Sequence, residues 1–115
     1  MSYSILSLYC VWDDQFKVYS DPFLAADDNA AERILVQTAI LSDELRKRLC
    51  FYSLHCVGTF YPTLVSPVRA LKRSRYVSSP ARLMDLVDAT ERAQKAHLAT
   101  VSASDSDFKE VSENE

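Results

Sequence analysis

Residues 11–23 read VWDDQFKVYSDPF, and this stretch decides the fold. The apolar run before it is short and rich in β-branched and aromatic residues, so residues 4–12 are predicted to form a strand buried on both faces. Asp13, Asp14 and Gln15 form the turn, and residues 16–19 form a short returning strand. Pro22 lacks the N–H that a strand ladder needs and ends the hairpin. The alternative is an extended loop over the same residues.

A helix is predicted directly after this stretch. Asn29 can act as its N-cap, with Glu32 reaching back to the cap, and apolar residues recur at helical spacing over residues 30–41. Ser42 then either restarts this helix or caps a second short one that carries Arg46, Lys47 and Arg48.

A second apolar and aromatic run, residues 49–61, predicts a strand that bends at Gly58 and ends at Pro62. The connection from the first strand is long enough for a crossover, which allows the first and last strands to pair in parallel. Residues 1–65 therefore read as the core of an α+β fold: a small mixed sheet built as strand, hairpin, helix and strand.

Three further segments follow this core. Residues 66–79 are a basic connector bracketed by prolines. Ser79 and Pro80 are a typical cap and first residue for a C-terminal helix over residues 80–98, with Leu83, Met84 and Val87 as its thin apolar edge. Residues 99–115 are rich in Ser, Asp and Glu and are predicted to be a disordered acidic tail.

Composition excludes several classes of protein. With 48% hydrophobic residues the chain should be globular, and at 115 residues it should be one domain. Gly58 is the only glycine, so the glycine-rich loops that cradle phosphates are absent. No apolar run reaches the roughly 20 residues of a membrane span. Three cysteines without a C-x-x-C pair indicate a reducing cytoplasm, with Cys50 and Cys56 as small buried apolar residues.

No residue pattern points to catalysis. His55 and His97 lack metal-ligand spacing, so we expect no metal or other cofactor, and Asp13 and Asp14 fit an ordinary turn. His55 is interpreted as a histidine held by hydrogen bonds in or beside the core, and His97 as solvated. The chain is therefore not expected to be an enzyme.

The net charge of the chain is −3, and the charged residues are distributed unevenly along it. Residues 66–84 hold five basic and no acidic side chains, whereas residues 85–115 hold three basic and eight acidic ones. Basic residues with an aromatic beside them suit phosphates and an exposed base. The candidate nucleic-acid-binding residues are Arg69, Lys72, Arg73, Arg75, Tyr76 and Arg82, joined by Arg46, Lys47 and Arg48 if the fold brings them close. The alternative is a solvated loop whose charge balances the acidic tail.

The order of these motifs resembles the small nonstructural protein of gokushoviruses, tailless phages of the microvirus group with circular single-stranded DNA. The matching parts are Pro22-Phe23, the pair Ala31 and Arg33 at the helix start, and Gly58 with Phe60 at the strand end. The resemblance as a whole covers about residues 5–62. The sequence departs from the family pattern at Tyr61-Pro62, and residues 78–115 have no counterpart in it.

The resemblance implies a DNA-binding or single-strand-synthesis accessory protein, made in the cytoplasm of the infected bacterium and absent from the mature virion. We therefore expect non-specific binding to single-stranded DNA that assists viral DNA synthesis or packaging, without membrane association. The alternative is a protein–protein interaction module that binds phage or host replication or assembly proteins. Free sheet edges in so small a domain make a homodimer plausible.

Overall fold

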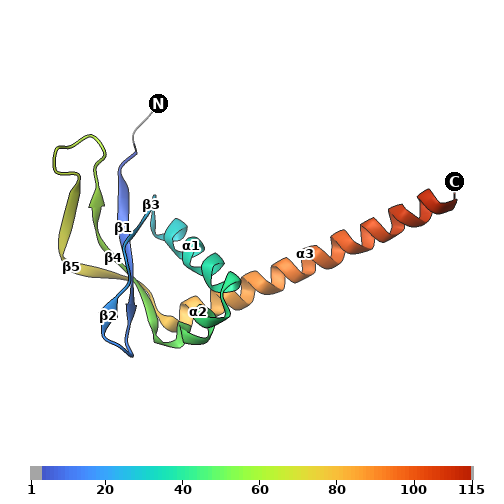
Figure 1. Cartoon of the computed structure of the whole chain (residues 1–115), viewed down its shortest axis with the longest axis horizontal. Helices are drawn as coiled ribbons and strands as arrows, with labels where there is room; N and C mark the ends of the chain where they lie inside the picture. Colours follow the sequence, from blue (N-terminus) through green and yellow to red (C-terminus); the bar gives the residue numbers. More distant parts are fainter. Residues whose placement is uncertain (1–3, 115) are drawn as a thin grey trace.

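The computed structural model describes the backbone of residues 4–114 and the side chains of residues 4–99. Five strands form one curled antiparallel sheet in the order β2-β1-β4-β5 (Figure 1), and β3 pairs with β1 beside β2. The strands are β1 (Leu6–Asp13), β2 (Val18–Tyr19), β3 (Phe23–Ala25), β4 (Tyr52–Phe60) and β5 (Val68–Ser78). The α+β class predicted from the sequence is confirmed.

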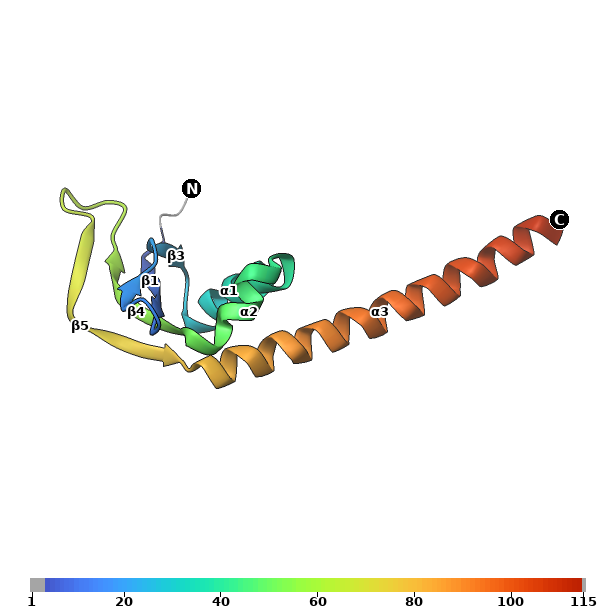
Figure 2. The ribbon, with the colours of Figure 1, turned by 60° about the horizontal axis from the view of Figure 1, so that its bottom comes forward.

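The helices pack on one face of this sheet (Figure 2). They are α1 (Asp28–Leu41), α2 (Asp43–Arg48) and α3 (Pro80–Asn114), with a 3-10 turn, η1 (Leu49–Phe51), before β4. The first turns of α3 lie against α1, and the rest of the helix runs away from the sheet (Figure 1). Among the described residues, no helix combines the length and the apolar character that crossing a lipid bilayer requires.

The predicted hairpin forms, and the extended-loop alternative does not. The Asp13 carboxylate accepts hydrogen bonds from the backbone N–H groups of Gln15 and Phe16, at 2.9 and 3.2 Å, which closes the turn. Lys17 takes a positive φ of 56° at its end. Phe23 then packs on Tyr9 with ring centroids 5.9 Å apart, so the chain returns to the beginning of β1.

The sequence allowed the first and last strands of the core, β1 and β4, to pair in parallel, but they do not. The return of the chain through β3 explains why. Because β3 brings the chain back to the start of β1, α1 and α2 carry it to the other end, where Tyr52 lies opposite Asp13. β4 therefore runs antiparallel to β1.

The N-cap of α1 lies two residues before the predicted one. Asp27, and not Asn29, accepts the hydrogen bond from the N–H of Ala30, at 2.8 Å. Glu32 is consequently not part of a capping box and turns toward Arg82 and Ser78. Ser42 caps the separate helix α2 through the N–H of Leu45, which decides between the two alternatives left by the sequence.

The core lies between the sheet and the helices. Its buried side chains come from β1, β4, α1 and α3, and include Tyr9, Val11, Ala31, Leu35, Leu54, Cys56, Leu83 and Val87. The buried edge of α3 is Leu83 and Val87 as predicted, whereas Met84 is exposed and Leu86 packs against the core instead. Full burial of each leucine or valine side chain among them contributes about 1.5–3 kcal/mol. Cys50 was expected to be buried and is exposed, because it lies in η1 and not in the strand.

The segment predicted as a basic connector is a strand, β5, hydrogen-bonded to β4. Sequence patterning missed it because nearly every side chain of β5 is exposed, so the segment lacks apolar alternation. Gly58 allows its close approach: a Cβ at Gly58 would lie 2.7 Å from the Arg69 carbonyl oxygen. The predicted helix over residues 80–98 is present as the first part of α3. The segment predicted to be a disordered acidic tail, residues 99–115, is covered by the last turns of α3 as far as Asn114, and its side chains are described only at residue 99.

Candidate nucleic-acid interface

Eight of the nine candidate residues are basic, and in the structure these eight fall into two groups. Four arginines are bound by carboxylates: Arg46, Arg48, Arg75 and Arg82. The other basic side chains make no ion pair or hydrogen bond with any described residue: Arg69, Lys72, Arg73 and Lys47. Tyr76 belongs to neither group and contacts another ring.

Arg75 is held on the helix-covered face of the sheet. Its guanidinium donates two hydrogen bonds to the Asp28 carboxylate, at 2.8 and 2.9 Å, and the Tyr9 hydroxyl donates a third at 2.7 Å. The hydrogen bonds from Arg75 lower the pKa of Asp28 to about 2. Burial, followed by the hydrogen bond to Asp28, raises the pKa of Tyr9 to about 12. Arg75 therefore fastens β5 to the beginning of α1.

Arg82 is bound in the same way to Glu32, which is only 6% exposed. Nε of Arg82 lies 2.5 Å from one Glu32 oxygen and Nη2 lies 3.0 Å from the other, while the Ser78 hydroxyl also donates to the carboxylate. The hydrogen bonds from Arg82 lower the pKa of Glu32. This cluster ties the end of β5 and the start of α3 to α1.

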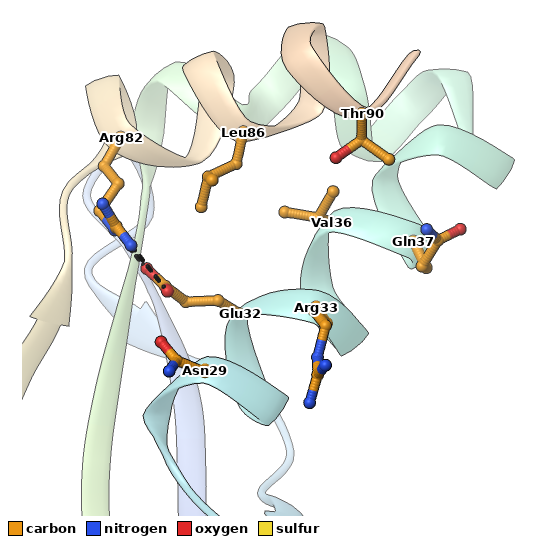
Figure 3. Close-up of a pocket in the computed structure, with 8 residues that line it drawn as sticks. All are labelled: Asn29, Glu32, Arg33, Val36, Gln37, Arg82, Leu86 and Thr90. Atoms are coloured by element: carbon orange, nitrogen blue, oxygen red, sulfur yellow. Dashed lines mark hydrogen bonds and ion pairs between the residues drawn. The ribbon is translucent and has the colours of Figure 1, made fainter. Parts of the chain in front are cut away.

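A hollow of about 370 Å³ lies beside this ion pair, between α1 and α3. Figure 3 shows Val36 and Leu86 facing each other across it, Glu32 and Arg82 joined at one end, and Arg33 directed away. Arg82 in this hollow is already neutralised by Glu32, and the unpaired Arg33 of the lining is directed away from it.

Arg46 and Arg48 are bound to partners outside β5. Arg46 bonds to Glu91 and to the Ile40 carbonyl oxygen, which links α2 to α1 and α3. Arg48 bonds to Asp13 at 2.7 Å and to Gln15 at 2.8 Å, where β1 ends and β4 begins. Arg46 and Arg48 are therefore held in ion pairs, whereas Lys47 is exposed and has no ion-pair partner among the described residues. That residues 46–48 add to the basic patch stays a prediction.

Two of the three unpaired basic residues of β5, Lys72 and Arg73, lie at an irregularity in the strand, and the third, Arg69, lies outside it. Cys56 pairs with Arg75 and Gly58 with Ala70, so residues 71–74 lie opposite Val57 alone. We call residues 71–74 the β5 bulge. Bulges of this kind re-aim side chains and bend a strand, and both Lys72 and Arg73 are exposed on this one. A bulged, charged edge also resists pairing with another strand.

An aromatic row lies on the face of the sheet opposite the helices. Tyr9, Val11, Leu54 and Cys56 point to the helices, so alternation places Trp12 and His55 on the other face. Tyr19 is the register partner of Trp12, and Tyr76 is the register partner of His55. Ring centroids are 4.8 Å apart for Trp12 and Tyr19, 5.7 Å for Tyr19 and His55, and 5.0 Å for His55 and Tyr76.

Hydrogen bonds fix this row beside the β5 bulge. The Ser74 hydroxyl lies 3.0 Å from the Tyr19 hydroxyl and 3.4 Å from Nδ1 of His55. Nε2 of His55 lies 2.8 Å from the Ser53 hydroxyl, and burial lowers the pKa of the imidazole. The prediction that His55 is held by hydrogen bonds is confirmed, and His97 is exposed on α3.

A second hollow, of about 350 Å³, adjoins the row. Its lining comes from the sheet, η1 and the start of α3: Trp12, Asp14, Cys50, Phe51, Ser53, His55, Tyr76 and Pro80. Of these lining residues, only Tyr76 was predicted from the sequence to bind nucleic acid. The hairpin register that pairs Trp12 with Tyr19 was the available signal, since it puts two aromatic rings on one face.

Asp13 and Asp14 have structural roles. Asp13 caps the turn and binds Arg48, and Asp14 binds Lys17 at 2.7 Å. The hydrogen bond from Lys17 lowers the pKa of Asp14. Within residues 4–99, no three His, Cys, Asp or Glu side chains gather closely enough to hold a metal ion.

Comparison of the chain with protein-family models, with curated proteins and with solved structures returns no match. The site must therefore be argued from its own geometry.

Proposed function

We propose that the protein is a non-enzymatic single-stranded DNA-binding protein that assists the synthesis or packaging of a viral single strand in the bacterial cytoplasm. The observation that carries the proposal is the pair Lys72 and Arg73. Both are exposed on the β5 bulge, and no described carboxylate neutralises either of them. Unpaired cations fixed on a strand edge suit a phosphate backbone, which is recognised largely through charge.

Arg69 extends this basic surface along β5. It pairs in register with Thr59 and is also exposed and without an ion-pair partner among the described residues. The net charge of −3 argues against a protein that coats and neutralises packaged DNA, since that role requires a strongly basic chain. A local basic surface on an acidic protein fits reversible and salt-sensitive binding instead.

Fluorescence anisotropy of a labelled single-stranded oligonucleotide tests the proposal. We expect binding at low salt, and we expect Lys72→Ala/Arg73→Ala to weaken it about tenfold because two phosphate contacts are lost. The matched control is Arg33→Ala/Lys95→Ala, which removes one Arg and one Lys that are exposed and unpaired on the helices. Absence of binding by the unmodified chain at low salt would end the proposal.

A protein–protein role is the second candidate, favoured by α3. From Arg92 to Ala99 every side chain of this helix is exposed, including Leu98. Capture of partners from infected cells, repeated after nuclease treatment, separates the two roles. Partners that survive the nuclease support the protein–protein role, and partners that vanish support DNA binding.

A further inference from the structure

The aromatic row lies uncovered in the described part of the chain, although large rings are usually buried or used for contacts. Tyr76 is 56% exposed and Tyr19 is 42% exposed. His55, which contacts both tyrosines, and Trp12, which contacts Tyr19, are half-buried. The core, by contrast, buries Tyr9 from the same sheet almost completely. The row therefore contributes little to the core.

The ring geometry leaves stacking surface at Tyr76. Its ring makes one aromatic contact, with His55, at an interplanar angle of 77°. A perpendicular contact occupies at most one face of the tyrosine, so at least one face has no aromatic neighbour. His55 also meets Tyr19 at 85° and is itself fixed by Ser53 and Ser74, which makes it a support for both tyrosines.

The position of the charges indicates what would cover the row. Ser74 bonds to Tyr19, and Arg73 and Lys72 precede Ser74 in the β5 bulge. Arg73 and Lys72 are one and two residues from Ser74 along the chain, and Ser74 is the residue that bonds to the row. A flat, uncharged group linked to phosphates matches this arrangement, and a base in a single strand has that chemistry. The hollow of about 350 Å³ beside Trp12 and Tyr76 is of a size that encloses small ligands.

We infer that the aromatic row is a base-stacking site that binds unpaired bases of single-stranded DNA, with Tyr76 as its outermost ring. This inference rests on the proposed function and adds to it a reason for preferring single strands. Bases in a duplex are already stacked and paired, so they cannot lie on Tyr76. Contacts to phosphates alone would not distinguish a single strand from a duplex, because both carry phosphates.

The test compares two labelled strands of equal length and equal phosphate number, an oligothymidylate and an abasic strand. The unmodified protein should bind oligothymidylate at least about fivefold more tightly, because stacking on one aromatic ring is worth that much or more. Tyr76→Leu should remove most of this preference, Tyr76→Phe should retain it, and Phe16→Leu, which removes an exposed ring outside the row, should leave it unchanged.

Trp12 supplies an independent readout because it is the only tryptophan in the chain and lies 4.8 Å from Tyr19. Unlabelled oligothymidylate should quench its fluorescence, and the abasic strand should not. Equal binding and equal quenching by both strands would overturn the stacking site and leave the proposed function standing. If Tyr76→Leu keeps the preference for oligothymidylate over the abasic strand, the assignment of base stacking to this row would be overturned. Failure of both strands to bind would overturn the proposed function as well.

Discussion

The two faces of the sheet use basic and aromatic side chains in different ways. On the helix-covered side, Arg75 is bound to Asp28 and Arg82 to Glu32, and Tyr9 is buried and hydrogen-bonded. On the uncovered side and its edge, Lys72 and Arg73 have no described partner, and Tyr76 is more than half exposed. The same residue types thus hold the fold together on one side and remain available on the other. A count of positive charges along the sequence cannot separate these two uses.

Glu32→Ala should give the largest effect on the structural side. The substitution leaves the Ser78 hydroxyl buried without its acceptor and disconnects α1 from α3, so we expect the free energy of unfolding to fall by about 3 kcal/mol. Urea denaturation measures this change. Affinity for single-stranded DNA, corrected for the folded fraction, should remain that of the unmodified protein. A parallel loss of affinity would mean that the two sides are not independent.

Gly58→Ala tests the close pairing of β4 with β5. An added Cβ would lie 2.7 Å from the Arg69 backbone oxygen, so β5 must shift, at an expected cost of about 2 kcal/mol in the free energy of unfolding. Because β5 also carries the bulge, this variant should lose both stability and affinity. An unchanged denaturation midpoint for Gly58→Ala would contradict the close approach of the two strands.

The Asp28 carboxylate should make a smaller and pH-dependent contribution to the free energy of unfolding. Its pKa is lowered from 3.8 to about 2, so the stability that it supplies is complete above pH 4 and is lost as the pH falls through 2. The ion pair is about half exposed, and solvent screening reduces its worth to about 1 kcal/mol. The difference in unfolding free energy between the unmodified protein and Asp28→Asn should shrink by most of that amount between about pH 5 and pH 2. A difference that is constant with pH would show that the charge of Asp28 contributes nothing.

The sequence predicted those parts of the molecule whose signals are local. The Asp13 turn, the caps at Ser42 and Ser79, and the edge formed by Leu83 and Val87 each depend on a few neighbouring residues. Strand direction was not accessible, because it depends on β3 returning the chain to the start of β1 through only three residues. β5 was missed because an exposed edge strand has no apolar alternation to detect.

The candidate site was predicted in part and for the same physical reason. Charge clustering located Lys72 and Arg73, but it also selected Arg75 and Arg82, whose partners Asp28 and Glu32 are distant in sequence. Pairing across such a distance is a property of the folded chain. The aromatic row likewise comes from four residues on four separate parts of the sequence, brought together by the sheet register.

The salt dependence of DNA binding tests the central claim most directly, namely that the unpaired cations of the β5 bulge contact phosphates. The slope of the logarithm of the association constant against the logarithm of salt concentration is about −0.7 for each phosphate neutralised on a single strand. Lys72→Ala/Arg73→Ala should therefore make the slope shallower by about 1.4, and Arg33→Ala/Lys95→Ala should leave it unchanged. Equal slopes for the Lys72/Arg73 variant and the unmodified protein would contradict the account.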